Sequence, residues 1–537
     1  MGGGGPKAGT DRVPAGIGPL LVVLLALLVS AAPAKAQTEG TKPDCSGSLQ
    51  AEVDAAAPGT TVELARGCVY REMVTVGKPL TLSGGGEGGI RGSDVWKDWK
   101  EQGGRWTSAK PVPRFAAPER SVCEEGTRRC LQHEQVFADG EPLAQVDSDP
   151  EPGQFALDAG RRVVLAESPA GHRIEVTTRP SWIVGAADDV TVRGIAMKHA
   201  AETGVWNGGY SRWVVEGNDL SHAHEKNLAL TLGRDLAARG NELHDAGQLG
   251  MSSNEADVEI VGNRVYGNNT EGFSAVWEAG GMKVSQARTA TISGNEVYRN
   301  GEIGIWTDVV NGAQTSVRIT DNRVHHNPRQ GIRVEITKNF VVRDNVLWEN
   351  GWGQGDSYNG SGISVNGSRD GLVAGNVLAW NASGIGVVQQ DRDGAHEQDY
   401  DTTANIRLEG NEVIQDEVPG ASDHAAVFWN GDVGAVAGGA PSVTAPESNN
   451  AGTNNAYWFD EPEGTTPRFK WDRQLETLAE YEDTPAEKGG RYLSAGEKNA
   501  LLQEHALPAS PPPRPASPDG PGGFVAGVLV WVRSLLS

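Results

Sequence analysis

The pattern in TISGNEVYRNGEIGIWTD (Thr291–Asp308) returns in RITDNRVHHNPRQGIRVEI (Arg318–Ile336) and in LVAGNVLAWNASGIGVVQQ (Leu372–Gln390). Each copy has a short apolar run, then Gly-Asn or Asp-Asn, a second apolar run, another Asn and Gly-Ile. The Asn that follows Gly or Asp recurs every 22 to 35 residues, at Asn218, Asn241, Asn263, Asn295, Asn322, Asn345, Asn376 and Asn411. A repeat of this length predicts a solenoid in which every coil supplies short strands.

The repeats predict strands and not helices. Their apolar runs are short, rich in β-branched residues, and alternate with polar residues at a period of two. Gly and Asn between the runs suit tight corners that need a positive φ. Equivalent Asn residues on successive coils would stack and hydrogen-bond along the solenoid axis. We therefore interpret these Asn residues as structural and not as members of a site.

Four motifs stand in consecutive coils: WEAGGxK at Trp277–Lys283, GxxGIWTD at Gly301–Asp308, GIxxEI at Gly331–Ile336 and SGIxVxxS at Ser361–Ser368. With these motifs, residues 50–508 resemble secreted bacterial right-handed parallel β-helix proteins of the pectate-lyase-like superfamily. The resemblance implies an all-β fold, a right-handed parallel β-helix. It favours a carbohydrate-active protein and leaves the reaction open.

The two ends of the chain carry their own signals. Lys7 and Arg12, the apolar run Leu20–Val29 and Ala34-Lys35-Ala36 have the order of a signal peptide over residues 1–36. They predict a secreted, extracellular protein, either free or associated with the cell surface. The apolar run Phe524–Leu536 is shorter than the ~17–25 residues of a spanning helix. It would serve as a weak tether or as a tail without function, so we expect no strong membrane association.

The four cysteines belong in an oxidising compartment. Pairing neighbours along the chain gives Cys45 with Cys68 and Cys123 with Cys130, although four cysteines allow three connectivities. No C-x2-C zinc pattern is present in the sequence.

The sequence suggests a fixed order of regions. A short amphipathic helix at Leu49–Ala57 would cap the first coil. Three Trp lie within Val95–Thr107, and we favour packing against an insertion over sugar binding for them. The coil pattern breaks at Ser121–Pro180, which reads as hairpins of a small inserted β-subdomain. The regions are the cap and first coils (45–115), the insertion (121–180), the β-helix repeats (181–435), an irregular segment with short helices (436–508), and a Pro-rich linker with a short apolar tail (509–537).

Charge narrows the class of partner. The net charge of −23 argues against nucleic acid and against an anionic membrane surface. It also disfavours a polyanionic ligand unless a basic groove or a bound cation compensates. We expect a polysaccharide partner and a monomeric protein.

Strand parity places a candidate site on the outside of the coils. When the coils are aligned on Gly-Ile, the alternation of a β-strand predicts that the Ile side chains point inward and that the residues next to them in the strand point outward. In this register Asp308, Glu335 and Asn366 stack above one another, and Glu278 would extend the column by one coil. Rungs lie ~4.8 Å apart, so the Asp308 and Glu335 carboxyl groups would be neighbours of like charge. Such a pair needs a shared proton, a basic partner or a cation.

Asp308, Glu335 and Glu278 are therefore the candidate catalytic residues. The sequence places candidate substrate-binding side chains around them. We expect Trp306 to present an exposed ring to a sugar face and Arg333 to bind hydroxyl or carboxylate groups. The remaining candidates on this face are Lys283, Asn366, Gln389 and Arg392, with loop packing as the equal alternative for the last two.

Three interpretations fit this column. Two carboxyl groups ~5–5.5 Å apart match a retaining glycoside hydrolase. Alternatively the column binds Ca²⁺, and Lys283, His244 or Arg333 is the base of a polysaccharide lyase or epimerase. The usual pectate-lyase signatures and the Tyr/Asp/His cluster of mannuronan epimerases have no match here. The third interpretation is a noncatalytic glycan-binding or surface-displayed solenoid. No cofactor is required by the sequence, and the metal, if one binds, is left open.

Overall fold

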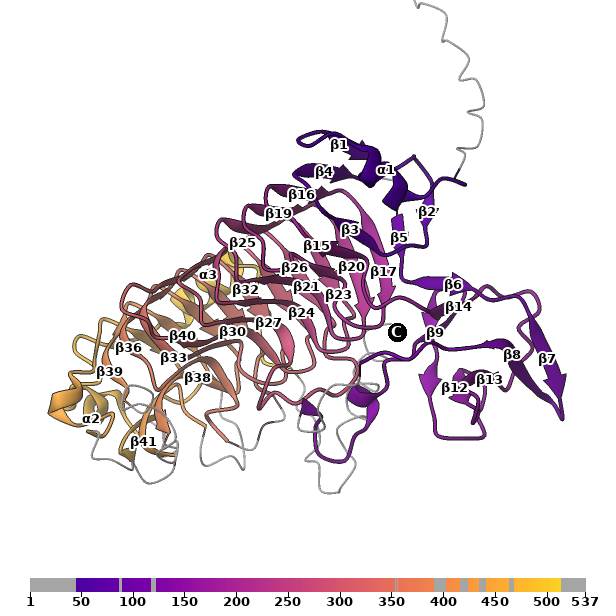
Figure 1. Ribbon diagram of the computed structural model, residues 1–537. Helices are drawn as coiled ribbons and strands as arrows, with labels where there is room; N and C mark the ends of the chain where they lie inside the picture. The colour runs from indigo at the N-terminus through magenta and orange to yellow at the C-terminus, as the bar shows by residue number, and fades with distance from the viewer. Residues whose placement is uncertain are drawn as a thin grey trace, which may run out of the picture. The chain divides into compact units, whose positions relative to one another are not determined.

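The computed structural model describes residues 45–85, 89–116, 122–352, 354, 356–390, 402–415, 424–433, 441–462 and 468–512. Successive coils each contribute three strands, and equivalent strands of neighbouring coils pair in parallel. The result is a solenoid with three faces, which we call the first, second and third sheets (Figure 1). The predicted parallel β-helix is confirmed.

The strands fall into the three sheets as follows. The first sheet holds β1 (Thr61–Glu63), β4 (Leu80–Ser83), β16 (Val190–Arg193), β19 (Trp213–Glu216), β22 (Leu236–Arg239), β25 (Asp257–Val261), β28 (Thr289–Ser293), β31 (Ser316–Thr320), β36 (Arg369–Ala374), β39 (Ala404–Glu409) and β42 (Ala451–Thr453). The second sheet holds β2 (Val69–Tyr70), β5 (Gly89–Arg91), β17 (Ala196–Ala200), β20 (Asp219–Ala223), β23 (Glu242–His244), β26 (Arg264–Tyr266), β29 (Glu296–Tyr298), β32 (Arg323–His325), β34 (Val346–Trp348), β37 (Val377–Ala379), β40 (Glu412–Ile414), β43 (Ala456–Trp458) and β46 (Arg491–Tyr492). The third sheet holds β3 (Val74–Val76), β15 (Ile183–Gly185), β18 (Val205–Trp206), β21 (Lys226–Thr231), β24 (Leu249–Asn254), β27 (Gly280–Ser285), β30 (Ile303–Val310), β35 (Ser361–Asn366), β38 (Ser383–Gln390), β41 (Val427–Val433) and β44 (Phe469–Trp471). Strand β33 (Ile332–Arg343) runs through the third and first sheets, and β45 (Arg473–Leu475) pairs antiparallel with β44.

The corner between the first two sheets explains the repeated Gly-Asn and Asp-Asn pairs. The residue before the Asn has a left-handed backbone, with φ of 63° at Gly294 and 59° at Asp321. Gly adopts this conformation freely, and Asp is among the side chains that tolerate it. The Asn that follows is buried, so its amide groups must bond within the protein.

The buried Asn residues bond to one another along the axis. Asn295 Nδ2 donates to Asn322 Oδ1 at 2.9 Å, and Asn322 Nδ2 donates to Asn345 Oδ1 at 2.9 Å. The ladder continues to Asn455, whose Nδ2 donates to Glu487 Oε2 at 2.7 Å. The predicted structural role of these Asn residues is confirmed.

Both ends of the stack are covered. Helix α1 (Leu49–Ala55) buries Leu49 and Val53 against the first coil, as predicted, and its N-cap is Ser48. Helix α2 (Leu478–Glu482) packs at the opposite end, near β44 and β45 (Figure 1). Helix α3 (Ala495–Glu504) buries Leu502 in an apolar cluster with side chains of the second sheet.

The insertion consists of two small sheets. One holds β6 (Ser93–Val95), β9 (Val136–Ala138), β10 (Glu141–Pro142) and β14 (Ile174–Thr177), and the other holds β7 (Trp99–Gln102), β8 (Arg105–Pro111), β11 (Ala144–Gln145), β12 (Gln154–Leu157) and β13 (Arg162–Leu165). Residues 93–111 therefore belong to these sheets and not to the first coils, where we expected them. Trp96 is buried in their common core, and Trp99 and Trp106 pack against it.

The two expected disulfides, Cys45–Cys68 and Cys123–Cys130, are both formed. Among the described residues, no helix combines the length and apolar character needed to cross a membrane. The predicted signal peptide and the apolar run Phe524–Leu536 lie outside the described residues.

Candidate functional site

The register predicted for the candidate column is confirmed. Asp308 of β30 is the partner of Glu335 on β33, and Glu335 is the partner of Asn366 on β35. Two residues earlier on each strand, Trp306 is the partner of Arg333. Two adjacent columns of outward positions therefore run along the third sheet.

A groove of about 1400 Å³ follows this outward face. Asp308, Glu335, Lys283, Trp306 and Arg333 all line it. It also reaches residues of much earlier coils, among them Trp206, Ala229, Thr231, Ser252 and Asn254. The two carboxyl groups thus lie inside a long cleft and not on an open surface.

The Glu335 carboxylate is held by three donors. Arg333 donates to Oε1 at 2.7 Å, Trp306 Nε1 donates to Oε2 at 3.0 Å, and Asn366 Nδ2 lies 3.3 Å from Oε1. Glu335 is only 3% exposed. The three donors thus compensate for the burial of the Glu335 carboxyl group.

Asp308 has a different environment. Its Oδ2 lies 2.9 Å from Lys283 Nζ. Burial raises the pKa of Asp308 above its ordinary value, Lys283 opposes this shift, and the neighbouring Glu335 charge adds to it. The two neighbouring carboxyl groups thus differ in their surroundings.

Trp306 is not the exposed sugar platform that we expected. It is only 2% exposed, since both neighbouring rungs place a cation against its ring. Lys283 Nζ lies 3.6 Å from the ring centroid and the guanidinium carbon of Arg333 lies 4.6 Å from it. The ring is therefore a spacer between two cations. Its N–H orients Glu335.

Asn366 hydrogen-bonds to Glu335 from the next rung and does not line the groove. It is fully buried, and its Nδ2 is also 3.0 Å from the hydroxyl of Tyr358 and 2.7 Å from Gln390 Oε1. The prediction that Asn366 binds substrate is therefore wrong. Tyr358 lines the groove and lies beside Arg333, with 5.4 Å between its ring centroid and the guanidinium carbon.

Glu278 does not extend the acidic column, contrary to the prediction. The partner of Asp308 on the preceding coil is Ser285. Glu278 lies in the loop before β27, where it lines the groove and its Oε2 pairs with Lys226 Nζ at 2.9 Å. The error arose because Gly281-Met282 takes the place of Gly-Ile in this coil.

The remaining predicted residues lie elsewhere. Gln389 is fully buried and bonds to Thr403 N and Pro441 O, so it packs a loop and does not bind substrate. His244 lies on the second sheet between Asp219 and Asp245, away from the groove lining, so it cannot be the base considered above. Arg392 lies outside the described residues.

The donor set does not fit a Ca²⁺ site at this column. Calcium takes six to eight oxygen ligands, whereas Asp308 and Glu335 already face Lys283, Arg333 and the Trp306 N–H. Over the residues that the structure describes, no cluster of three His, Cys, Asp or Glu side chains could hold a metal ion. Cations from the protein thus occupy the place that a metal ion would take.

The backbone is strained directly after both carboxyl residues. Val309 has a φ of 54° and Ile336 a φ of 45°, which β-branched residues rarely adopt. The equivalent corners of other coils hold Leu232, Glu255, Gln286 and Gly367, also at positive φ. Val309 and Ile336 line the groove. The positive φ at this corner is therefore a feature of the repeat and does not by itself mark a site.

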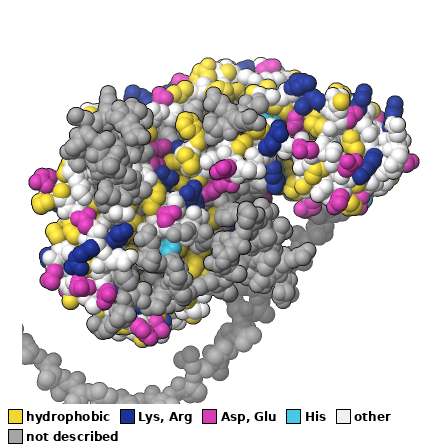
Figure 2. Space-filling view, turned by 90° about the horizontal axis from the view of Figure 1, so that it is seen from below, with side chains coloured by type: hydrophobic (Ala, Val, Ile, Leu, Met, Phe, Trp, Pro, Cys, Tyr) yellow, Lys and Arg dark blue, Asp and Glu magenta, His cyan; other side chains and the backbone are white. Residues whose placement is uncertain are grey.

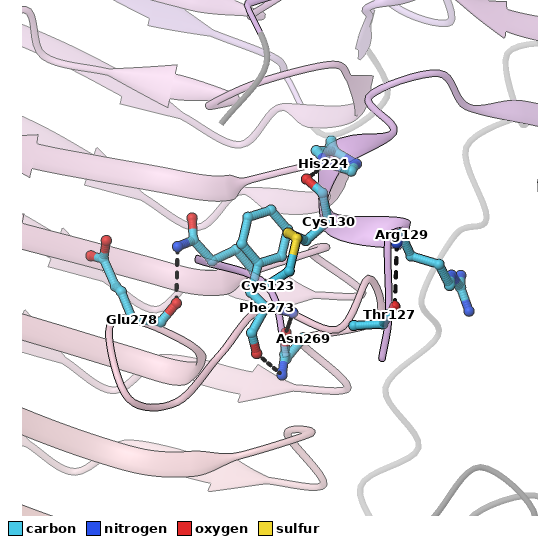
Figure 3. The surroundings of a disulfide bond; sticks show 9 residues. Cys123, Thr127, Arg129, Cys130, His224, Asn269, Phe273 and Glu278 are labelled. Carbon is cyan, nitrogen blue, oxygen red and sulfur yellow. Dashed lines mark hydrogen bonds between the residues drawn. A yellow bond between two sulfur atoms is a disulfide. The ribbon is translucent and has the colours of Figure 1, made fainter. Parts of the chain in front are cut away.

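The loop that carries Trp277 and Glu278 is fastened by the Cys123–Cys130 disulfide loop (Figure 3). Ser274 N–H donates to Val122 O at 2.7 Å, and Arg129 pairs with Glu271 at 3.0 Å. The disulfide packs in an apolar cluster with Phe273. The insertion thus fixes one wall of the groove.

Two groove residues with exposed rings are not among the predicted site residues. Trp206 is 40% exposed and Trp277 is 64% exposed, and both line the groove. The sequence contains a signal for Trp206. If the Gly-Ile motif is widened to Gly followed by any apolar residue, Gly204-Val205-Trp206 aligns with Gly304-Ile305-Trp306. On the face that Figure 2 shows, Lys and Arg side chains are interspersed with Asp and Glu side chains.

Comparisons with known proteins address the fold. Residues 193–378 match the family described as right handed beta helix region, and no curated protein matches the sequence. The solved structure of XylC in complex with xylose is 16% identical, with a TM-score of 0.53 over 79% of this chain and 83% of that chain. The A-module of the mannuronan C-5 epimerase AlgE6 from Azotobacter vinelandii is 14% identical, with a TM-score of 0.39 over 83% and 94%. Together with the coil register, the family match and the similarity to XylC show that this chain is a right-handed parallel β-helix protein.

Proposed function

We propose that this protein is a secreted retaining glycoside hydrolase that acts on an extracellular polysaccharide. The observation that carries the proposal is the pair Asp308 and Glu335 on neighbouring rungs inside a long groove. Neighbouring strands lie ~4.8 Å apart, close to the ~5–5.5 Å between the carboxyl groups of retaining enzymes. The secreted location is supported by the two disulfides and by the signal-peptide features of residues 1–36.

The two environments suggest the two roles. Asp308, whose pKa burial raises, protonates the glycosidic oxygen as that bond breaks. Glu335, held by Arg333 and Trp306, attacks the anomeric carbon and forms a glycosyl ester. Water then attacks this ester, its proton passes to the Asp308 carboxylate, and Glu335 is released. Both residues return to their starting state.

A lyase is less well supported. Uronate β-elimination requires a cation beside the substrate carboxylate and a base at the α-carbon. In this groove Lys283 pairs with Asp308 and Arg333 pairs with Glu335, so both cations are already committed. Because these ion pairs would also be compatible with a protein that binds a glycan without cleaving it, noncatalytic glycan binding is the alternative function that the test must distinguish.

The test is a turnover screen of the purified mature protein on neutral and uronate polysaccharides, with Ca²⁺ and with chelator. Reducing ends and near-ultraviolet absorbance are read together, because lyase products carry a new double bond. Release of reducing ends that is lost in Asp308→Asn and Glu335→Gln supports the proposal. Glu278→Gln is the matched control, since Glu278 lines the same groove but pairs with Lys226. Ultraviolet-absorbing products, or glycan binding without turnover, would overturn it.

A further inference from the structure

The groove continues well beyond the two carboxyl groups. Trp206 stands in the same column as Lys283 and Trp306, three rungs before Lys283. Between them the column holds Ala229 and Ser252. Four rung spacings separate Trp206 from the Trp306 rung, a length of about 19 Å at ~4.8 Å per rung.

The adjacent column is equally small and uncharged along this stretch. Counting back from Asp308, its members are Ser285, Asn254 and Thr231. Together with Ala229 and Ser252, these residues form what we call the neutral floor, and all five line the groove. The floor offers hydroxyl and amide groups that can donate and accept hydrogen bonds. It carries no side-chain charge.

Aromatic side chains mark both the far end and one wall of the floor. Trp206 is 40% exposed and its Nε1 donates to Thr231 Oγ1 at 3.0 Å, which fixes the ring at the end of the floor. Trp277 is 64% exposed, and its carbonyl oxygen accepts from Lys283 Nζ at 2.7 Å. Exposed rings of this size are unusual on a protein surface and suit the apolar faces of pyranose rings.

The charged groups around the floor disfavour an anionic ligand. Glu202, Glu225 and Glu278 line this part of the groove, and Lys226 lies 2.9 Å from Glu278. A polyuronate would bring one carboxylate per sugar toward these acidic residues, with the whole chain at −23. A neutral chain meets no such repulsion.

We infer that the neutral floor between Trp206 and the Lys283 rung is an extended binding site for an uncharged pyranose glycan several sugar units long. The inference rests on the proposed function only in placing the reacting bond at Asp308 and Glu335. Binding along the floor makes the enzyme act on long chains and prefer them over short fragments. Each added sugar unit that covers the floor tightens binding until Trp206 is reached.

The test uses the mature Glu335→Gln protein, in which the proposed nucleophile is removed so that oligosaccharides are not consumed during the measurement. Calorimetry compares neutral xylo-, manno- and gluco-oligosaccharides of increasing length with galacturonate and mannuronate oligomers. We expect at least one neutral series to bind, more tightly as the chain lengthens, and the uronates to bind weakly or not at all. Binding of the uronates in preference to every neutral series would overturn the inference.

Variants then locate the contact. Trp206→Ala should weaken the binding of the longest neutral oligosaccharide about tenfold, as expected for a loss of ~1.4 kcal/mol of binding free energy. It should leave the binding of the shortest one unchanged. Trp277→Ala provides a second, independent variant. Tyr210→Ala is the matched control, since Tyr210 is 38% exposed in the same coil as Trp206 but does not line the groove. An equal loss of affinity in Tyr210→Ala, or an unchanged affinity in both Trp variants, would contradict the inference.

The two proposals fail separately. Binding that depends on Trp206 without any turnover by the wild type would refute the hydrolase and leave the binding site standing. Turnover that depends on Glu335, with a KM for long neutral chains unchanged by Trp206→Ala, would refute the binding site alone.

Discussion

The indole N–H of Trp306 donates to Glu335 Oε2 at 3.0 Å, while the Trp306 ring lies between Lys283 and Arg333. One buried side chain thus joins both carboxyl residues into a single network, since Lys283 pairs with Asp308 and Arg333 with Glu335. Such a network holds each group in one orientation, which catalysis requires of its residues.

Replacing Trp306 with Phe tests this network. Phe keeps a ring between the two cations but leaves Glu335 Oε2 without its N–H donor. A hydrogen bond to a charged group contributes about 1.5–3 kcal/mol, so we expect kcat to fall about 10- to 100-fold with little change in KM. Trp348→Phe is the control, because Trp348 is also buried but lies on the second sheet. An equal loss of kcat in both variants would show a general packing effect.

Lys283→Met should move the pH profile. Lys283 lowers the pKa of Asp308, so removing its charge raises that pKa further and keeps the acid form to higher pH. The alkaline limb of kcat/KM, where Asp308 loses its proton, should therefore shift to higher pH. Lys226→Met, which removes the cation beside Glu278, should leave the limb in place. A shift toward lower pH in Lys283→Met would contradict the acid role of Asp308.

Glu302→Gln should change the pH dependence of stability. Burial and a hydrogen bond to Glu124 raise the pKa of Glu302 well above its ordinary value, and Arg329 opposes this. The folded state then keeps a proton that the unfolded state loses above pH ~4.3, so the contribution of Glu302 to stability falls as pH rises. Denaturant unfolding at pH 5 and pH 8 should show that the free energy of unfolding falls less between these two pH values in Glu302→Gln than in the wild type. An equal loss in both proteins would contradict the shifted pKa.

Opening the Cys123–Cys130 disulfide should affect the groove more than the solenoid. A double Cys123→Ser/Cys130→Ser variant loosens the disulfide loop that packs on Phe273 and so removes the support of the neighbouring loop that carries Trp277. We expect weaker glycan binding and faster proteolysis within residues 269–278, with the cooperative unfolding of the solenoid retained. Cys45→Ser/Cys68→Ser is the matched control, as that disulfide lies at the N-terminal coil. Unchanged glycan binding in the first variant would mean that the loop holds its place without the disulfide.

The sequence predicted the solenoid and much of the site because both depend on local periodicity. Gly-Ile recurs at the same point of four coils, and parity then places Asp308 above Glu335 without any knowledge of distant contacts. The Asn ladder follows from the same repeat. Where the anchor changed to Gly281-Met282, the register was lost and Glu278 was misplaced.

What the repeat does not encode was predicted less well. The burial of Trp306 depends on Lys283 and Arg333, which reach its ring from the rungs on either side. The start of the insertion at Ser93 depends on β6 pairing with β14, about eighty residues later along the chain. Side-chain packing and distant antiparallel pairing leave no periodic trace, so these features emerge only in three dimensions.

Covalent trapping is the sharpest test of Glu335 as the nucleophile. The mature protein is incubated with 2-deoxy-2-fluoro glycosides of neutral sugars bearing a good leaving group, and its peptides are then weighed by mass spectrometry. We expect one fluoroglycosyl group on Glu335, retention of anomeric configuration in normal turnover, and no label in Glu335→Gln. Turnover with inversion of configuration, or a label on another residue while Glu335→Gln stays active, would contradict this role of Glu335.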